Sequence, residues 1–129
     1  MPLGTVVAGG DPNVLVLAPQ DVLWNSWLTN DNWQWGKESP PGSNVSLTQP
    51  LGTTVVSNGD AYAFALNQEQ NTWACWYDTA WQWTDLGQPA SNTNVVLPVG
   101  TGLFGSNAAL FGLDIQGNLW MLLSSQSGT

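Results

Sequence analysis

The chain has 129 residues and a mass of 13.8 kDa, the size of one small domain that can bury its own core. Only 8% of the residues are charged, the net charge is −8, and Lys37 is the only base, with no Arg and no His. This composition argues against a nucleic-acid binder, which needs Lys or Arg to neutralise phosphates, and against catalysis or metal binding through imidazole. Nine Trp residues argue against a disordered chain.

Short strands separated by turn-forming segments follow one another along the chain. In the first third, the turn-forming segments are residues 9–13, 19–21, 30–32 and 39–44. In the middle third, strands are predicted over residues 53–57, 61–66, 72–77 and 81–86, because β-branched and aromatic residues are concentrated there. No stretch has an apolar stripe of helical period. We therefore predict an all-β protein.

A repeat of about 48 residues organises these strands. The tetrapeptide Pro-Leu-Gly-Thr at residues 2–5 returns at 50–53 and, as Pro-Val-Gly-Thr, at 98–101, and the triplet Trp-Gln-Trp at 33–35 returns at 81–83. Trp24, Trp73 and Trp120 also correspond. The single domain 1–129 thus divides into repeats 1–48, 49–96 and 97–129, the third of which lacks its outer strand.

Four strands in a repeat of this length match a blade of a β-propeller. Residues 14–17 and 63–66 are apolar at every position, as expected of strands sandwiched between neighbouring blades. Three blades are too few to close a ring, so we expect a homo-oligomer, favouring a dimer with six blades. A β-trefoil is the alternative fold, because it also combines threefold repetition with four strands per repeat.

The first repeat runs from VVAGGDPNVLVL at residues 6–17 through VLWNSW at 22–27 to WQWGKE at 33–38. This order resembles the repeat of bacterial and fungal β-propeller lectins, including fucose-binding lectins and the tectonin group. The resemblance implies carbohydrate binding at sites between blades. Because the chain has no Arg, the Arg-based fucose site of the fungal fucose-binding lectins has no counterpart here.

Sugar binding requires a flat apolar ring face and nearby hydrogen-bonding groups, which indole rings and Asn or Asp side chains supply. Trp33 and Trp81 follow polar turns at the start of a strand, so we expect them at the rim with one ring face open. Asp31 and Asp78 share a loop with these rings. The predicted ligand-binding residues are Trp33, Trp81, Asp31, Asp78, Trp27, Trp76, Asn13, Asp60 and Asn107.

Structural roles compete with these assignments. The Trp residues at positions 24, 73 and 120 recur in all three repeats and are expected in the core, and Trp35 and Trp83 also fit structural positions. Asp11, Asp60 and Asn107 occupy equivalent first turns, where Asn and Asp are ordinary turn formers. Cys75, the only cysteine, is expected to be buried and inert.

The sequence therefore predicts a lectin that binds the glycans of glycoconjugates, with no catalytic residues, no cofactor and no metal ion, so that binding survives chelation. A structural or protein-binding propeller is the first alternative, and a glycoside hydrolase, which needs two opposed carboxylates, is the second. No secretory signal and no apolar run long enough for a membrane span is visible, which predicts a soluble protein, cytoplasmic or secreted by a non-classical route.

Overall fold

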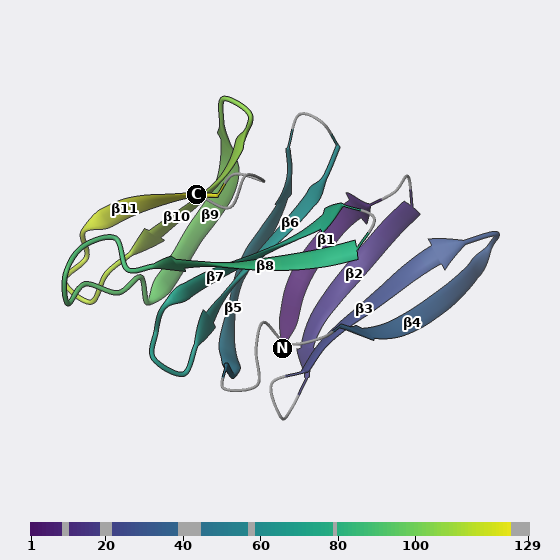
Figure 1. The fold of residues 1–129 in the computed structure, drawn as a ribbon, viewed down its shortest axis with the longest axis horizontal. Coiled ribbons are helices and arrows are strands. Elements are labelled where there is room, and N and C mark those ends of the chain that lie inside the picture. Colours follow the sequence, from purple (N-terminus) through teal and green to yellow (C-terminus); the bar gives the residue numbers. More distant parts are fainter. Residues whose placement is uncertain (9–10, 19–21, 39–44, 57–58, 79, 125–129) are drawn as a thin grey trace.

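The computed structural model is built from three antiparallel β-sheets (Figure 1). It describes residues 1–8, 11–18, 22–38, 45–56, 59–78 and 80–124, and these ranges hold eleven strands and no helix. Sheet I contains β1 (Pro2–Ala8), β2 (Asp11–Ala18), β3 (Val22–Thr29) and β4 (Asn32–Glu38). Sheet II contains β5 (Leu47–Val55), β6 (Ala61–Asn67), β7 (Thr72–Asp78) and β8 (Ala80–Gly87), and sheet III contains β9 (Leu97–Phe104), β10 (Asn107–Leu113) and β11 (Leu119–Ser124).

Each sheet is a meander in which consecutive strands pair antiparallel. Within the described residues, no strand of one sheet joins the ladder of another, and sheet III has three strands where the others have four. The prediction of an all-β chain is confirmed. The described part of the chain also contains no helix that could cross a membrane.

A β-bulge recurs at the same place in all three sheets. The register of the first strand shifts between Pro2 and Gly4 in sheet I, between Pro50 and Gly52 in sheet II, and opposite Phe111 and Gly112 in sheet III. The residues at the bulges are Leu3, Leu51 and Val99, so the repeat seen in the sequence is also a repeat of backbone geometry.

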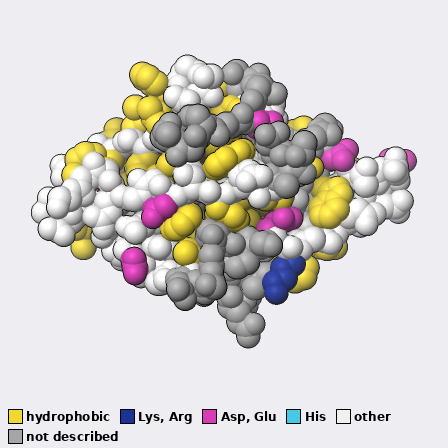
Figure 2. Space-filling model, viewed as in Figure 1, with side chains coloured by type: hydrophobic (Ala, Val, Ile, Leu, Met, Phe, Trp, Pro, Cys, Tyr) yellow, Lys and Arg dark blue, Asp and Glu magenta, His cyan; other side chains and the backbone are white. Residues whose placement is uncertain are grey.

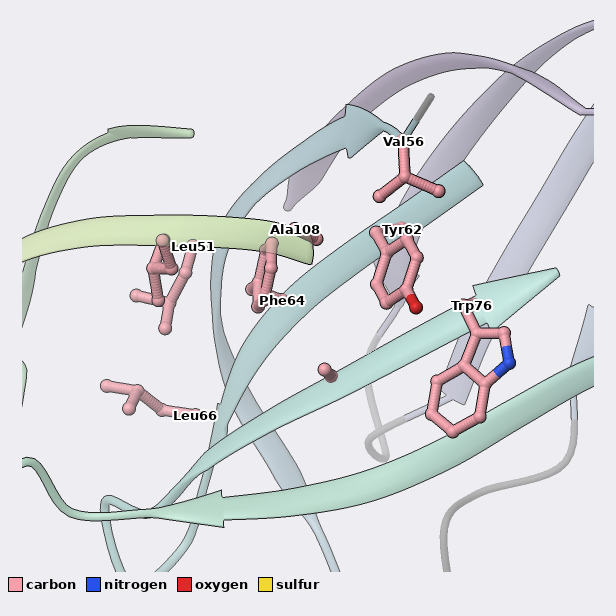
Figure 3. Close-up of a cluster of buried hydrophobic side chains, with 9 residues drawn as sticks. Leu51, Val56, Tyr62, Phe64, Leu66, Trp76 and Ala108 are labelled. Carbon is pink, nitrogen blue, oxygen red and sulfur yellow. The ribbon is translucent and has the colours of Figure 1, made fainter. Parts of the chain in front are cut away.

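Sheet II lies between the other two sheets and supplies both halves of the core (Figure 1). On one face, Tyr62, Phe64 and their neighbours pack against Ala108 and Leu110 of sheet III (Figure 3). On the other face, Ala61, Ala63 and Cys75 pack against side chains of sheet I. Because it has a sheet on each side, β6 is buried at all seven positions, which explains the apolar run from Ala61 to Leu66.

The two outer faces of the stack carry exposed apolar side chains. We call the side of sheet III that faces away from sheet II its terminal face; it carries Val99, Phe104, Leu119, Met121 and Leu123. The terminal face of sheet I, facing away from sheet II, carries Val7, Trp33 and Trp35. Hydrophobic side chains also reach the surface at several places in the space-filling view, where acidic side chains lie singly (Figure 2).

Candidate functional site

The indole rings of Trp33 and Trp35 lie open to solvent. Both belong to the outer strand β4 and point to the terminal face of sheet I, since alternate residues of a strand share a face. Trp33 is 53% exposed and Trp35 is 63% exposed. The expectation of an open ring at position 33 therefore fits the structure, whereas Trp35 is not the core residue that its sequence also allowed.

Their counterparts in the second repeat have a different environment. Trp81 and Trp83 are half-buried, and both pack against the cluster of buried side chains between sheets I and II. Trp81 also contacts the ring of Tyr77, with centroids 5.4 Å apart and a tilted geometry. Trp81 therefore has less free ring surface for a sugar than Trp33.

The second pair of predicted aromatic contacts is also unequal. Trp76 is 8% exposed and stacks on Tyr62, with ring centroids 5.9 Å apart (Figure 3). Trp27 is half-buried, and its ring lies so close to Gly36 that a β-carbon there would stand 3.0 Å from Trp27 Cζ3. Trp76 thus serves as part of the core between sheets II and III.

The predicted acidic contacts fall in turns. Asn30 and Asp31 have φ values of 50° and 62°, the geometry of a two-residue type I′ hairpin turn between β3 and β4. Asp31 is exposed beside Trp33, so these two predicted residues do lie together at the tip of one hairpin. Asp78 ends β7, and its side chain lies outside the described part of the structure.

The remaining predicted polar residues are dispersed. Asn13 is buried within β2, donates from Nδ2 to the carbonyl oxygen of Asp11 at 2.8 Å, and is the cross-strand partner of Trp27. Asp60 precedes β6, where burial and then the negative charge of Asp60 raise the pKa of Tyr62 to about 12. Asn107 begins β10 and is half-buried. The nine predicted residues are therefore distributed over all three sheets, with Asp31 beside Trp33 and Asn13 opposite Trp27.

The recurring Trp residues at positions 24, 73 and 120 are half-buried rather than enclosed. Trp120 donates from Nε1 to Asp114 Oδ2 at 2.9 Å, while the equivalent Nε1 of Trp73 is buried without a hydrogen-bond partner. The prediction that Cys75 is buried is confirmed, and burial, followed by the charge of Glu38, raises the pKa of its thiol well above the usual value.

A polar pocket of about 240 Å³ lies where sheets II and III meet. It is formed by the turn between β6 and β7, the segment that links β8 to β9, and the turn between β10 and β11. Its lining contains six polar side chains and two aliphatic ones: Gln70, Asn92, Thr93, Asn94, Val96, Asp114, Ile115 and Gln116. Four of the six polar side chains end in amides, which both donate and accept hydrogen bonds.

Hydrogen bonds fix the walls of this pocket. Asn94 Nδ2 donates to Gln70 Oε1 at 3.1 Å, which joins the linking segment to the turn of sheet II, while Asn94 Oδ1 is buried and unpaired. Asp114 Oδ1 accepts from the backbone N–H groups of Gln116 and Asn118, both at 2.9 Å. With Trp120 and Asn118 side chains on Oδ2, the carboxylate is saturated, and these bonds, that of Trp120 first, lower its pKa to about 2.

Sequence reasoning missed this pocket because it treated the turns one at a time. Asn67 and Asp114 are 47 positions apart, and each accepts hydrogen bonds from the backbone N–H groups two and four residues later. That repeated turn was a readable signal. The position of residues 92–94 between the two turns could not be predicted from the sequence, because it depends on how the sheets stack.

Two further results bear on chemistry at these sites. Within the ranges that the structure describes, no three Cys, Asp or Glu side chains gather closely enough to hold a metal ion. No protein-family model matches this chain, and no curated protein shows significant similarity to it.

Proposed function

We propose that the chain is a carbohydrate-binding protein, a lectin without catalytic activity, and that its sheets are blades of a β-propeller. Three meandering sheets stacked face to face, with no ladder shared between repeats among the described residues, support blades rather than the trefoil alternative. The resemblance of the first repeat to propeller lectins agrees with this reading.

The polar pocket between sheets II and III is the observation that carries the proposal. Its volume of about 240 Å³ has room for a sugar ring, and its amide groups offer alternating donors and acceptors for hydroxyl groups. Asp114 is already saturated by hydrogen bonds, so the groups available to a ligand are the neutral amides. A hydroxyl-rich, uncharged ligand matches this lining.

The negative charge of the chain favours neutral glycans over acidic ones. The chain has a net charge of −8 and a single basic residue, Lys37, which lies on β4 rather than at the pocket. Long-range repulsion therefore disfavours sialylated or sulfated glycans. We expect neutral glycans, bound weakly at each site and strengthened by avidity in a homo-oligomer, for which a dimer is favoured.

The test is binding of the full chain to an array of neutral and acidic glycans, followed by titration of the best neutral glycan. We expect the double variant Asn92→Gly with Gln116→Ala to lose affinity by about threefold to tenfold per hydrogen bond removed. Glycine suits position 92, where φ is 56°. Gln88→Ala, exposed on the same linking segment but outside the pocket lining, is the matched control.

Two results would contradict the proposal: no neutral glycan bound by the wild-type chain, or unchanged affinity in a folded double variant. If the chain binds peptides on a peptide array and no glycan, the protein-binding alternative is favoured. The titration is repeated with a chelator, where we expect no change because the polar groups that line the pocket include only one carboxylate.

A further inference from the structure

Besides the buried side chains, one hydrogen bond between neighbouring sheets is repeated every 48 residues. Thr53 Oγ1 donates to the carbonyl oxygen of Thr5 at 3.0 Å, and Thr101 Oγ1 donates to the carbonyl oxygen of Thr53. Each bond joins the first strand of one sheet to the first strand of the next. The stacking of sheet II on sheet I and that of sheet III on sheet II are therefore two copies of the same interface.

A glycine makes each approach possible. A β-carbon on Gly4 would stand 2.5 Å from Thr53 Oγ1, and one on Gly52 would stand 2.9 Å from Thr101 Cγ2. Any larger residue at either position would overlap the Thr side chain of the next sheet, which would have to shift. Gly100 occupies the same position in sheet III, yet nothing lies within 4 Å of the place where its β-carbon would be. The third sheet thus keeps the same small residue with no described neighbour against it.

The exposure of the bulge residues differs between the sheets in the same way. Leu3 and Leu51 are 8% and 5% exposed because the next sheet covers each of them, whereas Val99 is 61% exposed. The rest of the terminal face of sheet III is also apolar, with Phe104, Leu119 and Met121 open to solvent. This face therefore has the residues of a covered face, but no sheet in the described part of the chain covers it.

The other end of the stack has the complementary surface. Trp81 and Trp83 of sheet II pack against sheet I, while Trp33 and Trp35 at the equivalent positions are exposed. Val55 also packs against sheet I, and its counterpart Val7 is 53% exposed. The terminal face of sheet I thus presents the side chains that sheet II uses for stacking.

We propose that a second copy of this chain docks with the terminal face of its sheet I on the terminal face of sheet III. Thr5 of the second copy takes the place over Gly100 that Thr53 takes over Gly4, and its hydroxyl donates to the carbonyl oxygen of Thr101. The interface joins two different faces, so it is head-to-tail, and two chains that each offer both faces close a ring of six sheets. This inference deepens the oligomer of the proposed function by naming its interface.

Single substitutions on the two faces test the proposal. Val99→Asp places a charge on the terminal face of sheet III, and Trp35→Asp does so on that of sheet I, where docking of a second copy would take each charge out of water. In sedimentation velocity without any glycan, we expect the wild type to sediment at twice 13.8 kDa and each variant at 13.8 kDa, with association weakened at least about a hundredfold. Gln88→Asp, exposed on the segment that links β8 to β9 and outside both faces, is the matched control and is expected to associate like the wild type.

Mixing the two variants gives the sharpest result. Val99→Asp keeps an intact face on sheet I, and Trp35→Asp keeps an intact face on sheet III, so an equimolar mixture is expected to form a one-to-one dimer through one intact interface. An interface of like faces would instead leave Trp35→Asp or Val99→Asp dimeric alone. Circular dichroism confirms that each variant is folded, and Gly100→Gln, which points into open space in the single chain, serves as an independent blocking variant.

The outcomes separate the two proposals. A monomeric wild type at micromolar concentration, a variant on either face that stays dimeric, or a mixture that stays monomeric overturns the head-to-tail interface. A wild-type chain that is monomeric and still binds neutral glycans overturns the interface and leaves the lectin function standing. A ring that assembles as described but binds no glycan overturns the proposed lectin function and leaves the interface standing.

Discussion

The triplet Trp-Gln-Trp occurs once in sheet I and once in sheet II, and its environment differs between the two. In β4 both indole rings are more than half exposed, whereas in β8 both pack against the neighbouring sheet. Around the triplet, the register with the preceding strand is the same in the two sheets, and so is the side to which the rings point. Local sequence therefore sets the strand, while the presence of a neighbouring sheet decides whether its rings belong to a core.

The largest contrast is expected between a covered Trp and an open one. Trp76→Ala removes a ring that is stacked on Tyr62 and enclosed between two sheets, so we expect a loss of about 3–5 kcal/mol in the free energy of unfolding. Trp35→Ala removes an open ring, and we expect a change within about 0.5 kcal/mol. Both are measured by urea denaturation in the Val99→Asp background, in which no second copy docks.

An equal loss for both variants would contradict this reading of the two sheets. It would mean that Trp35 contacts more of the single chain than its exposure indicates. A loss confined to Trp76→Ala would show that burial by a neighbouring sheet, rather than residue type, determines the contribution of each ring.

The glycines give a second contrast of the same kind. Gly52 has a φ of 147° and lies against Thr101, so Gly52→Ala adds both backbone strain and overlap, and we expect it to cost about 1–3 kcal/mol. Gly100 is not among the glycines with positive φ and faces open space, so Gly100→Ala is expected to leave the stability of the monomer unchanged. Thermal unfolding of both variants, again in the Val99→Asp background, checks the prediction. A destabilised Gly100→Ala monomer would show that something in the same chain already occupies the space.

The all-β fold could be read from the sequence because its signals are local. Turn formers and the 48-residue repeat predict strands that the structure contains, and residues 63–66, which are apolar at every position, lie in β6, which is buried throughout. The predicted site could not be worked out from local signals alone. Trp33 and Trp81 have equivalent sequences, and only the stacking of sheets makes one open and the other half-buried.

The turn of the second repeat is held by an amide side chain, and the equivalent turn of the third repeat is held by a carboxylate. Asn67 and Asp114 hold equivalent turns, but only the carboxylate of Asp114 also accepts from the indole N–H of its Trp. The Nε1 of Trp73 is left buried and unpaired in the second repeat. We therefore expect Asp114→Asn to lower the melting temperature by leaving Trp120 unpaired as well, whereas an unchanged melting temperature would show that the indole bond adds nothing to folding.

The pH dependence of stability tests the same difference between a carboxylate and an amide at position 114. The pKa of Asp114 is lowered from 3.8 to about 2 in the folded chain, so its ionised form stabilises the fold above pH 3.8, and this contribution is lost as the pH falls through about 2. The wild type is expected to lose melting temperature over this window, and Asp114→Asn is expected to lose less. Parallel curves for the two proteins between pH 4 and about 2 would contradict the assignment.

The smallest effect is expected from the hydroxyl groups that cross between sheets. Thr53→Val removes the bond from Thr53 Oγ1 to the carbonyl oxygen of Thr5 while keeping the shape of the side chain, so we expect a loss of about 0.5–1.5 kcal/mol in the monomer. Thr5 is exposed, and its hydroxyl has no next sheet in the same chain. Thr5→Val should therefore leave the monomer unchanged and weaken only the association of two chains, which urea denaturation and sedimentation at several concentrations measure separately. A Thr5→Val monomer as destabilised as Thr53→Val would show that the hydroxyl of Thr5 already serves the single chain, and the equivalence of the internal and external interfaces would fail at this position.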